Sequence, residues 1–358
     1  MSTFLKNKAF CVLPFIEKFQ ALDGKDYLCC YSNRITLNND IVKLSSKILN
    51  GEQIPHCKKC YDLDVQRIVS PRLRESSRWL KDPEIVSYLT NWTPESEQKT
   101  FFYDLRFDNK CNLACISCNA MSSSLIAKEL NVTVPKYKLN FNVNDCLTAK
   151  KIYLAGGEPL IIDEFIDLIF KIADQDEQPE LAINTNLTII TPKLKSALSR
   201  IKNLTLTVSV DSFGRVNEYH RWPMKWSKFM NNLLYARNNL DCTIQLNSVV
   251  DAVTVINLAK LVEIEHLTDQ WSLSVLTSPG ALVVNNLPEK EKENIIQQFV
   301  NIKKSKFYSI DINFKSKVDG IIAQISNPGD PYLLSNYIAE IDQRRNINHI
   351  TYLGINLI

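Results

Sequence analysis

The sequence contains no long apolar run and carries almost no net charge. None of its apolar stretches approaches the roughly 18 residues that a membrane helix requires, and the run 11–16 is too short, and too interrupted by Pro14, for a signal peptide. The formal net charge is only +3, from 42 Lys and Arg against 39 Asp and Glu, so no large field of one sign exists to hold a nucleic acid backbone. We therefore expect a cytoplasmic protein without membrane or nucleic acid partners.

Cysteine, in contrast, is abundant and concentrated in the first third of the 358 residues. Eight of the ten cysteines lie at positions 11, 29, 30, 57, 60, 111, 115 and 118. A reducing cytosol does not sustain structural disulfides, so thiols gathered in this way are candidates for metal binding. Cys146 and Cys242 are isolated, and we expect them to be small core residues.

From about Thr100 the chain alternates short β-rich runs with amphipathic stretches. Strands are predicted at 101–107, 151–154, 181–184, 204–210, 243–249 and 272–276, and helices at 164–173, 192–200, 226–239 and 258–264. This alternation predicts an α/β fold, with a parallel sheet and right-handed crossovers that curl into a full or partial (β/α)6 TIM-like barrel. In such folds the chemistry lies at the carboxyl ends of the strands, so residues just after each strand are site candidates.

The rest of the chain is predicted to form smaller parts around this core. Residues 1–70 are strand-poor and turn-rich, with a hairpin turn expected at Asp23-Gly24, and should have little core of their own. The predicted parts are this cysteine-rich N-terminal module, a helical connector at 71–99, the main domain at 100–286, and a helical C-terminal extension at 287–358 with helices at 289–302 and 331–344.

Three cysteines lie on one short loop directly after the first predicted strand of the main domain. Cys111, Cys115 and Cys118 have a spacing that chance would produce in about one of a hundred such sequences. Three thiolates are one ligand short of a closed tetrahedral zinc or iron–sulfur site. A four-iron cluster held by three cysteines keeps one iron open, which S-adenosylmethionine (SAM) can chelate through its amino and carboxylate groups. The alternative is a zinc site completed by a distant residue.

This loop resembles the C-x3-C-x2-C signature of the radical SAM superfamily. The resemblance implies a [4Fe-4S] cluster whose electron splits SAM to give a 5′-deoxyadenosyl radical, with Cys111, Cys115 and Cys118 as the catalytic cluster ligands. One residue departs from the pattern, because the position before the third cysteine is commonly aromatic or large in that family and contacts the adenine, whereas here it is Ser117. Other groups must then complete the adenine site.

Candidate SAM ligands follow the later strands. Gly156, Gly157, Glu158 and Pro159 resemble the Gly-Gly-Glu-Pro motif of the superfamily, which binds the SAM amino group, although the same residues also suit an ordinary turn. The other candidates are Asn186 after the third strand, Ser209 and Asp211 at the end of the fourth, Arg221 beyond it, and Asn247 near the end of the fifth.

Arg221 has two interpretations. In the resembled enzymes an Arg at this place is associated with the SAM carboxylate, and its planar guanidinium suits that group. A surface ion pair is the alternative. The adjacent His220 is assigned no role.

The N-terminal cysteines form a second candidate site. A hairpin at Asp23-Gly24 would bring Cys11 near Cys29, and the Cys57–Cys60 spacing suits two ligands on one turn. Spacing alone does not separate zinc from an iron–sulfur cluster. Either Cys29 or Cys30 can be the ligand, because neighbours on a strand point to opposite faces, although Cys29 keeps a four-residue spacing from the glycine.

The order of Cys11, Gly24 and Cys29 resembles the opening of the auxiliary-cluster domains called SPASM and of their shortened form, called twitch. Those domains usually follow the barrel, whereas here the module precedes it, as in twitch domain-containing radical SAM proteins. The resemblance extends through nearly the whole chain. It implies a second, auxiliary [4Fe-4S] cluster with Cys11, Cys29, Cys57 and Cys60 as ligands.

The two cysteine sets together predict a radical SAM enzyme that takes a hydrogen from a peptide or protein side chain, because auxiliary clusters of this type are frequent in peptide-modifying relatives. A small molecule such as a sugar, nucleotide or lipid precursor is an alternative substrate. A non-catalytic binding protein with two zinc sites is a third hypothesis. The radical chemistry requires an electron donor of the flavodoxin or ferredoxin type as a partner.

Overall fold

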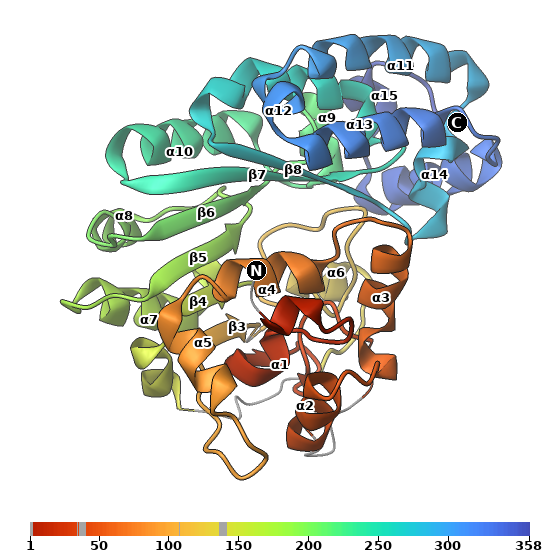
Figure 1. Ribbon diagram of the computed structural model, residues 1–358. Coiled ribbons are helices and arrows are strands. Elements are labelled where there is room, and N and C mark those ends of the chain that lie inside the picture. The colour runs from red at the N-terminus through yellow and green to blue at the C-terminus, as the bar shows by residue number, and fades with distance from the viewer. Residues whose placement is uncertain (1–2, 34, 36–40, 107, 136–141) are drawn as a thin grey trace. The chain divides into compact units, whose positions relative to one another are not determined.

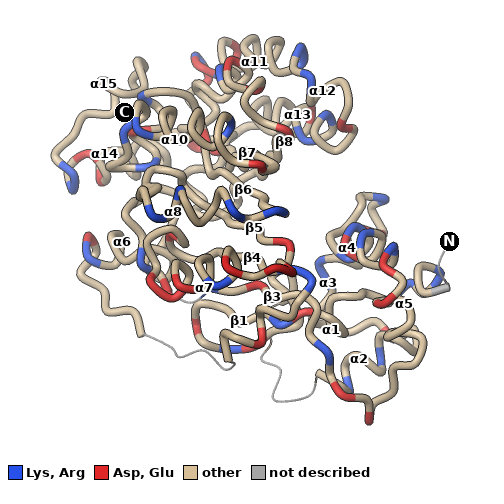
Figure 2. The backbone as a smooth tube through the Cα atoms, turned by 90° about the vertical axis from the view of Figure 1, so that its left-hand side faces the viewer, with Lys and Arg blue, Asp and Glu red and all other residues tan. Residues whose placement is uncertain are grey.

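The computed structural model (Figure 1) describes residues 3–33, 35, 41–106, 108–135 and 142–358, and the chain divides into two compact units. Unit 1 comprises residues 1–108 and 135–156, and unit 2 comprises residues 109–134 and 157–358. The chain passes from one unit to the other directly before the three-cysteine loop, and again between Gly156 and Gly157. Figure 2 shows Lys and Arg interspersed with Asp and Glu along the elements of each unit.

The strands of unit 1 are β1 (Glu17–Gln20), β2 (Asp26–Tyr27), β3 (Phe102–Leu105) and β4 (Lys151–Leu154). β1 and β2 pair antiparallel around the predicted turn, where Gly24 has φ +74°, a left-handed conformation that favours glycine. β1 pairs parallel with β3, and β3 pairs parallel with β4. In this register Phe19 lies opposite Asp104, and Asp104 lies opposite Tyr153, so their side chains share one face of the strands.

The helices of unit 1 are α1 (Leu13–Ile16), α2 (Ile41–Leu49), α3 (Lys58–Val65), α4 (Pro71–Trp79) and α5 (Pro83–Thr90), with 3-10 turns at Thr3–Lys6, Pro55–Cys57 and Val143–Thr148. α4 and α5 each begin with proline, whose missing N–H costs nothing at this position. Ser70 and Asp82 cap them by accepting hydrogen bonds from the backbone N–H of Leu73 and Glu84. Two helices therefore occupy the segment where a helical connector is predicted.

The first 70 residues contribute a large apolar core, so the expectation that they have little core is wrong. Their buried side chains pack with those of α4 and α5 in one cluster, whose members include Phe10, Val12, Leu13, Phe15, Ile16, Leu28, Ile48, Ile54, Trp79, Ile85 and Leu89. These residues are scattered through turns and short helices, so no period of 2 or 3.6 marks them in the sequence.

The strands of unit 2 are β5 (Glu180–Thr185), β6 (Leu204–Ser209), β7 (Cys242–Val250) and β8 (Gln270–Val275), and neighbours in this order pair parallel. Along β6 and β7 fully buried residues alternate with half-buried ones. Leu206 and Ile244 lie on the buried face, whereas Thr207, Ser209 and Asn247 lie on the other. This second face of the sheet is therefore polar.

The helices that accompany these strands are α6 (Ser124–Glu129), α7 (Asp163–Ala173), α8 (Pro192–Leu198), α9 (Arg215–His220) and α10 (Trp226–Asn239), with 3-10 segments at Pro159–Ile161, Thr254–Leu267, Gly280–Leu282 and Val284–Asn286. The 3-10 segment at Thr254–Leu267 covers the predicted helix 258–264. Asn257 has non-helical dihedrals of φ −125° and ψ 18°, and the preceding Val255 and Ile256 are β-branched, so an α-helix is disfavoured there.

The C-terminal part of unit 2 is helical, as predicted, with α11 (Glu289–Lys303), α12 (Lys306–Ile310), α13 (Ile312–Ile325), α14 (Pro331–Arg345) and α15 (His349–Leu353). α13 lies beside β8 in Figure 1, and α11 and α12 pack against α13. Trp271 of β8 packs its ring against Phe307 and Phe314, at centroid distances of 6.3 and 5.1 Å. The extension is thus fastened to the last strand by aromatic contacts.

The α/β fold with mostly parallel strand pairing is confirmed. β4 and α10 have the predicted bounds, and the other strands of the main domain differ from prediction by a few residues. β3 ends at Leu105, and Phe107 lies outside the described residues. Cys146 is fully buried as expected, whereas Cys242, at the start of β7, is half-buried. Among the described residues, none of the helices combines the length and the apolar character needed to cross a membrane.

Candidate functional site

The three-cysteine loop of unit 2 is fixed by hydrogen bonds from its own flank. The backbone N–H of Cys111 donates to Ser124 Oγ at 3.1 Å, and Ser123 Oγ donates to the carbonyl of Leu113 at 2.6 Å. Leu113 and Ile116 are almost fully buried between the cysteines, which are themselves half-buried and unpaired. The apolar residues therefore anchor the loop and leave the thiols partly accessible.

The three thiols lie close enough to affect one another electrostatically. Burial, together with negative charge on Cys118 and Cys111, raises the pKa of Cys115 to about 12. Burial likewise raises the pKa of Cys111 to about 11 and the pKa of Cys118 above its usual value. Mutually repelling thiolates at one place fit a multivalent cationic centre, because metal binding supplies the charge that removes their protons.

Arg221 is a positive group beside the thiols of this loop. Its Nη1 lies 4.0 Å from Cys115 Sγ, and its charge lowers the pKa of each of the three thiols. Its Nε lies 2.7 Å from a carboxylate oxygen of Asp211, with side chains only 12% and 1% exposed. The alternative of a surface ion pair is therefore wrong, since the pair is buried beside the cysteines.

A row of alternating charges continues behind Arg221. His220 is fully buried, with Nδ1 3.1 Å from Asp211 and Nε2 2.7 Å from Asp251. Burial alone would lower the pKa of His220, but Asp251 and Asp211 on its two sides raise it to about 9. Burial would raise the pKa of Asp211, but Arg221 and His220 hold it well below its usual range. The order Asp251, His220, Asp211, Arg221 is thus negative, positive, negative, positive.

The same segment also holds the loop through its backbone. The N–H of Ala114 donates to the carbonyl of Trp222 at 2.6 Å, and the N–H of Ile116 donates to that of His220 at 2.9 Å. From α14, Tyr337 Oη donates to the carbonyl of Ile116 at 2.7 Å, and Arg345 donates to that of Ala114 at 2.7 Å. Sequence reasoning missed Tyr337 and Arg345, because no motif marks residues more than 200 positions away.

The glycine pair after β4 is required by a close backbone approach. A Cβ added to Gly157 would lie 2.2 Å from the carbonyl oxygen of Lys110, directly before the first cysteine of the loop. Gly156 has φ +120°, and a Cβ there would lie 3.0 Å from the carbonyl oxygen of Asp108. The pair is therefore more than an ordinary turn, since only glycine lets the two loops meet.

Glu158 joins this turn to the end of β5. Its buried carboxylate accepts hydrogen bonds from Thr185 Oγ1 at 2.6 Å, from the N–H of Asn186 at 2.7 Å and from the N–H of Leu160 at 3.1 Å. Burial nevertheless raises its pKa. Glu158 also caps the 3-10 turn that begins at Pro159. Its carboxylate is thus fixed in place, and its contact with the SAM amino group stays a prediction.

Asn186 meets the cysteine loop through an amide network. Its Nδ2 donates to Asn112 Oδ1 at 2.9 Å, and Asn112 Nδ2 donates to Thr188 Oγ1 at 2.9 Å. Ser209 and Asn247 lie opposite each other in the β6–β7 register and are both half-buried. Ser209 Oγ donates to Asn184 Oδ1 at 3.3 Å. These side chains line the polar face of the sheet, and their predicted roles stay predictions.

The N-terminal cysteines of unit 1 separate into two environments. Cys11, Cys29 and Cys57 belong to the large apolar cluster, and burial followed by Cys57 and Cys60 raises the pKa of Cys11. Cys30 instead packs on the small cluster of Phe19, Ala21 and Tyr27, and its pKa is raised by burial and then by Asp104. Cys29 therefore shares the surroundings of Cys11, and Cys30 does not.

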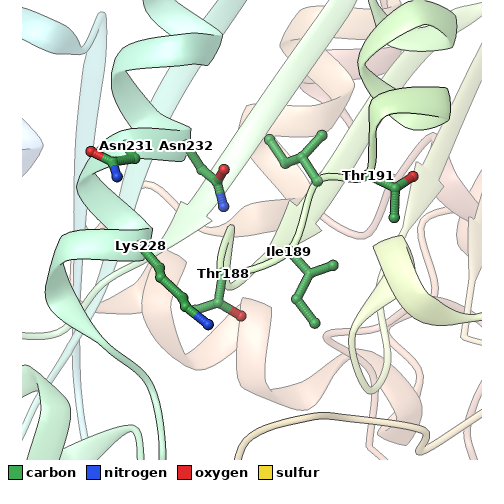
Figure 3. A pocket seen from close by; sticks show the side chains of 7 residues that line it. Thr188, Ile189, Thr191, Lys228, Asn231 and Asn232 are labelled. Carbon is green, nitrogen blue, oxygen red and sulfur yellow. The ribbon is translucent and has the colours of Figure 1, made fainter.

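Within the described ranges, no group of three or more His, Cys, Asp or Glu side chains is already arranged to hold a metal ion. The ligand assignments at both cysteine sets thus stay predictions. A pocket of about 360 Å³ lies in unit 2 between the loop after β5 and α10 (Figure 3), and Thr188, the partner of Asn112, is at its edge. Its lining residues are Thr188, Ile189, Ile190, Thr191, Lys228, Asn231 and Asn232. None of them is a predicted site residue.

Comparison with known proteins identifies the segment that carries this loop. Residues 105–253 match the family described as the Radical SAM superfamily. This segment is a radical SAM domain. The chain is also 27% identical over 107 residues to a GTP 3′,8-cyclase from Petrotoga mobilis, a match that covers 29% of this chain and 32% of that enzyme. The chain thus matches about a third of the length of this curated relative.

Solved structures are similar at low sequence identity. SuiB from Streptococcus suis, bound to S-adenosylmethionine, is 11% identical over 74% of this chain and 61% of its own, with a TM-score of 0.42. anSMEcpe with bound AdoMet is 14% identical over 59% of this chain and 61% of its own, with a TM-score of 0.41.

In the radical SAM domain, the variant Gly157→Ala should displace the turn after β4 from the cysteine loop. The added methyl group meets a backbone oxygen that no side-chain rotation can move, so we expect a loss of about 1–3 kcal/mol in the free energy of unfolding. Urea unfolding measures this loss. The control is Gly280→Ala, whose Cβ would meet nothing within 4 Å. Equal stability of the two variants would contradict the close approach.

The charge row predicts a specific pH dependence of stability. The pKa of His220 is raised from 6.5 to about 9, so its contribution is fully present below pH 6.5 and is lost as pH rises through 9. We therefore expect metal-free His220→Gln to be less stable than the parent protein. The difference in the free energy of unfolding should be up to about 3 kcal/mol larger at pH 6 than above pH 9. Urea unfolding at several pH values measures the difference, with the exposed His266→Gln as control. A difference independent of pH would mean that His220 is neutral in the fold.

Proposed function

We propose that the chain is a radical SAM enzyme that uses a [4Fe-4S] cluster, held by Cys111, Cys115 and Cys118, to take a hydrogen from a substrate. When bound, the cluster supplies the electron that splits SAM into methionine and a 5′-deoxyadenosyl radical. The observation that carries the proposal is the C-x3-C-x2-C loop within a radical SAM domain. The strands of such a protein would curl into a partial barrel.

Arg221 and the residues behind it would stabilise the cysteine thiolates. Its guanidinium lies beside Cys115, and hydrogen bonds or positive charge at cluster sulfurs tune the reduction potential of iron–sulfur sites. Since Asp211 is almost fully buried and paired with Arg221, we assign it a positioning role. We therefore assign Arg221 primarily to the cysteine thiolates that would hold the cluster, and only secondarily to the SAM carboxylate.

The remaining candidates would bind SAM. The Gly156–Pro159 turn lies against the start of the cysteine loop, so its carbonyl groups and the fixed carboxylate of Glu158 are suited to an ammonium group. Asn186 reaches the loop through Asn112, and Ser209 and Asn247 offer polar groups to ribose and adenine. Together these groups would compensate for the missing aromatic contact at Ser117.

Cys11, Cys29, Cys57 and Cys60 would hold the auxiliary [4Fe-4S] cluster of a twitch-like N-terminal module. The shared surroundings of Cys11, Cys29 and Cys57 support Cys29 over Cys30 as the fourth ligand. A module of this kind favours a peptide or protein side chain as substrate, with a sugar, nucleotide or lipid precursor as the alternative. The electron donor would be a cytoplasmic flavodoxin or ferredoxin.

The variant Cys115→Ala should lose SAM cleavage while the N-terminal cluster remains. A cluster held by two thiolates is poorly bound, so iron should fall from about eight to about four per chain. Both quantities are measured after anaerobic reconstitution, with 5′-deoxyadenosine quantified under a strong reductant. The control is Cys242→Ala, at the isolated half-buried cysteine. Undiminished 5′-deoxyadenosine in Cys115→Ala would show that the loop is misassigned.

The neighbouring cysteines Cys29 and Cys30 offer a matched pair of variants. Cys29→Ala should lose about four irons per chain and retain SAM cleavage, because only the auxiliary site loses a ligand. Cys30→Ala should retain all of its iron. Iron analysis together with visible absorption measures both, and the reverse pattern would assign the ligand to Cys30.

Colourless protein with stoichiometric zinc would instead support the zinc-binding hypothesis.

A further inference from the structure

The carbonyl groups of the residues before and after Cys115 accept hydrogen bonds only from α14, within the described part of the chain. Arg345 Nη2 donates to the carbonyl of Ala114 at 2.7 Å, and Tyr337 Oη donates to that of Ile116 at 2.7 Å. Ala114 and Ile116 are 1% and 2% exposed, so water does not readily replace either donor. The helix α14 therefore satisfies two buried acceptors of the cysteine loop.

These contacts fix the peptide groups around Cys115. Arg345 holds the peptide group that precedes Cys115, and the N–H of Ile116, in the peptide group that follows it, donates to the carbonyl of His220. Tyr337 holds the next peptide group through the carbonyl of Ile116. Because each peptide group is planar, fixing two successive groups fixes the φ and ψ of the residue between them. The direction in which the Cys115 side chain leaves the backbone is therefore set jointly by α14 and by the segment at His220.

Arg345 is itself fixed by a second partner. Its side chain is only 4% exposed, and its Nε and Nη2 donate to the two carboxylate oxygens of Glu129 at 2.9 and 3.1 Å. Glu129 is the last residue of α6, the helix that follows the cysteine loop. One guanidinium group thus joins the loop to the next helix, through a planar donor geometry that lysine does not have.

α14 is held in place by its own packing and by a contact with α9. Its inner face consists of three almost fully buried residues: Leu334, Ile338 and Ile341. Asp342 accepts a hydrogen bond from Tyr219 Oη at 2.9 Å, and Tyr219 directly precedes His220 in α9. The helix that binds the loop carbonyls is therefore tied to the segment that binds the loop N–H groups.

These contacts come from outside the segment that matches the radical SAM family. That match ends at residue 253, whereas α14 spans Pro331–Arg345. We propose that α14 is a clamp that positions the cysteine loop, with Tyr337 and Arg345 as positioning residues for the cluster that the loop would hold. The inference rests on the proposed function only where it connects the position of the loop to SAM cleavage. The C-terminal extension then contributes to the site itself.

Hydrogen exchange in the metal-free full chain tests the clamp without the cluster. Tyr337→Phe keeps the ring and removes the donor to the Ile116 carbonyl, so the N–H groups of Ala114 and Ile116 should exchange about fivefold faster or more. Mass spectrometry of the peptide that covers 111–118 measures the exchange. The control is Tyr332→Phe, the same change at an exposed tyrosine of the same helix. Exchange that is unchanged in this peptide, or accelerated equally throughout unit 2, overturns the proposal.

A matched pair of arginine variants tests the other contact of the clamp. Arg345→Lys keeps a positive charge beside Glu129 but loses the planar group that contacts Glu129 and the Ala114 carbonyl together, so the peptide 111–118 should again exchange about fivefold faster. Arg344→Lys is the control, because Arg344 is paired with Glu129 at 3.7 Å and should leave this exchange unchanged. Equal exchange of the peptide in the two variants overturns the role of Arg345.

The reconstituted chain connects the clamp to SAM cleavage. Tyr337→Phe should retain the iron content of the parent, because all three thiols are present, and should form 5′-deoxyadenosine about tenfold more slowly at saturating SAM, because the reacting groups are less well oriented. A parental rate at saturating SAM overturns this connection. Absence of 5′-deoxyadenosine from the parent itself would contradict the proposed function, and the exchange of the metal-free chain would still decide whether α14 is a clamp.

Discussion

The buried charge row from Asp251 to Arg221 is the constraint on which the cysteine loop depends. Each charge in the row has an opposite neighbour within about 3 Å, so the row can stay ionised without water. Arg221, the last member of the row, lies beside Cys115. The carbonyls of His220 and Trp222 accept hydrogen bonds from backbone N–H groups of the loop. The segment that carries the charge therefore also sets the path of the loop, and the thiols and their positive neighbour are positioned together.

The turn after β4 constrains the cysteine loop at its start, directly before Cys111. Gly157 lies against the carbonyl of Lys110, and Glu158 ties the turn to β5, where Asn186 in turn reaches Asn112 within the cysteine loop. A site built in this way is rigid in the sense required for orienting a cofactor, since Glu158, Asn186 and Asn112 are themselves hydrogen-bonded. The N-terminal cysteines are supported differently, by an apolar cluster that surrounds Cys11, Cys29 and Cys57.

Features that depend on residues close together in the sequence could be predicted. Strand alternation located β4 to β8 within a few residues, and the spacing of Cys111, Cys115 and Cys118 pointed to the radical SAM superfamily, whose family model matches residues 105–253. The sequence marked the Gly156-Gly157 pair as a candidate SAM site, whereas its close approach to the Lys110 carbonyl is visible only in the fold. The features that the sequence could not reveal depend on contacts between distant residues. The charge row around His220 forms only when the ends of two strands, 40 positions apart, come together. The contacts of Tyr337 and Arg345 form only once the C-terminal helices are in place. The core of the first 70 residues was missed because irregular structure leaves no periodic signal.

The central claim is that the three-cysteine loop holds a four-iron cluster with one iron open to SAM. Electron paramagnetic resonance of the reduced, anaerobically reconstituted protein tests it most directly, with the auxiliary ligands Cys11 and Cys57 replaced by Ala so that a single cluster contributes. The spectrum of the reduced cluster should change when SAM is added, because SAM binds the open iron. A cluster whose spectrum is the same with and without SAM would contradict the account.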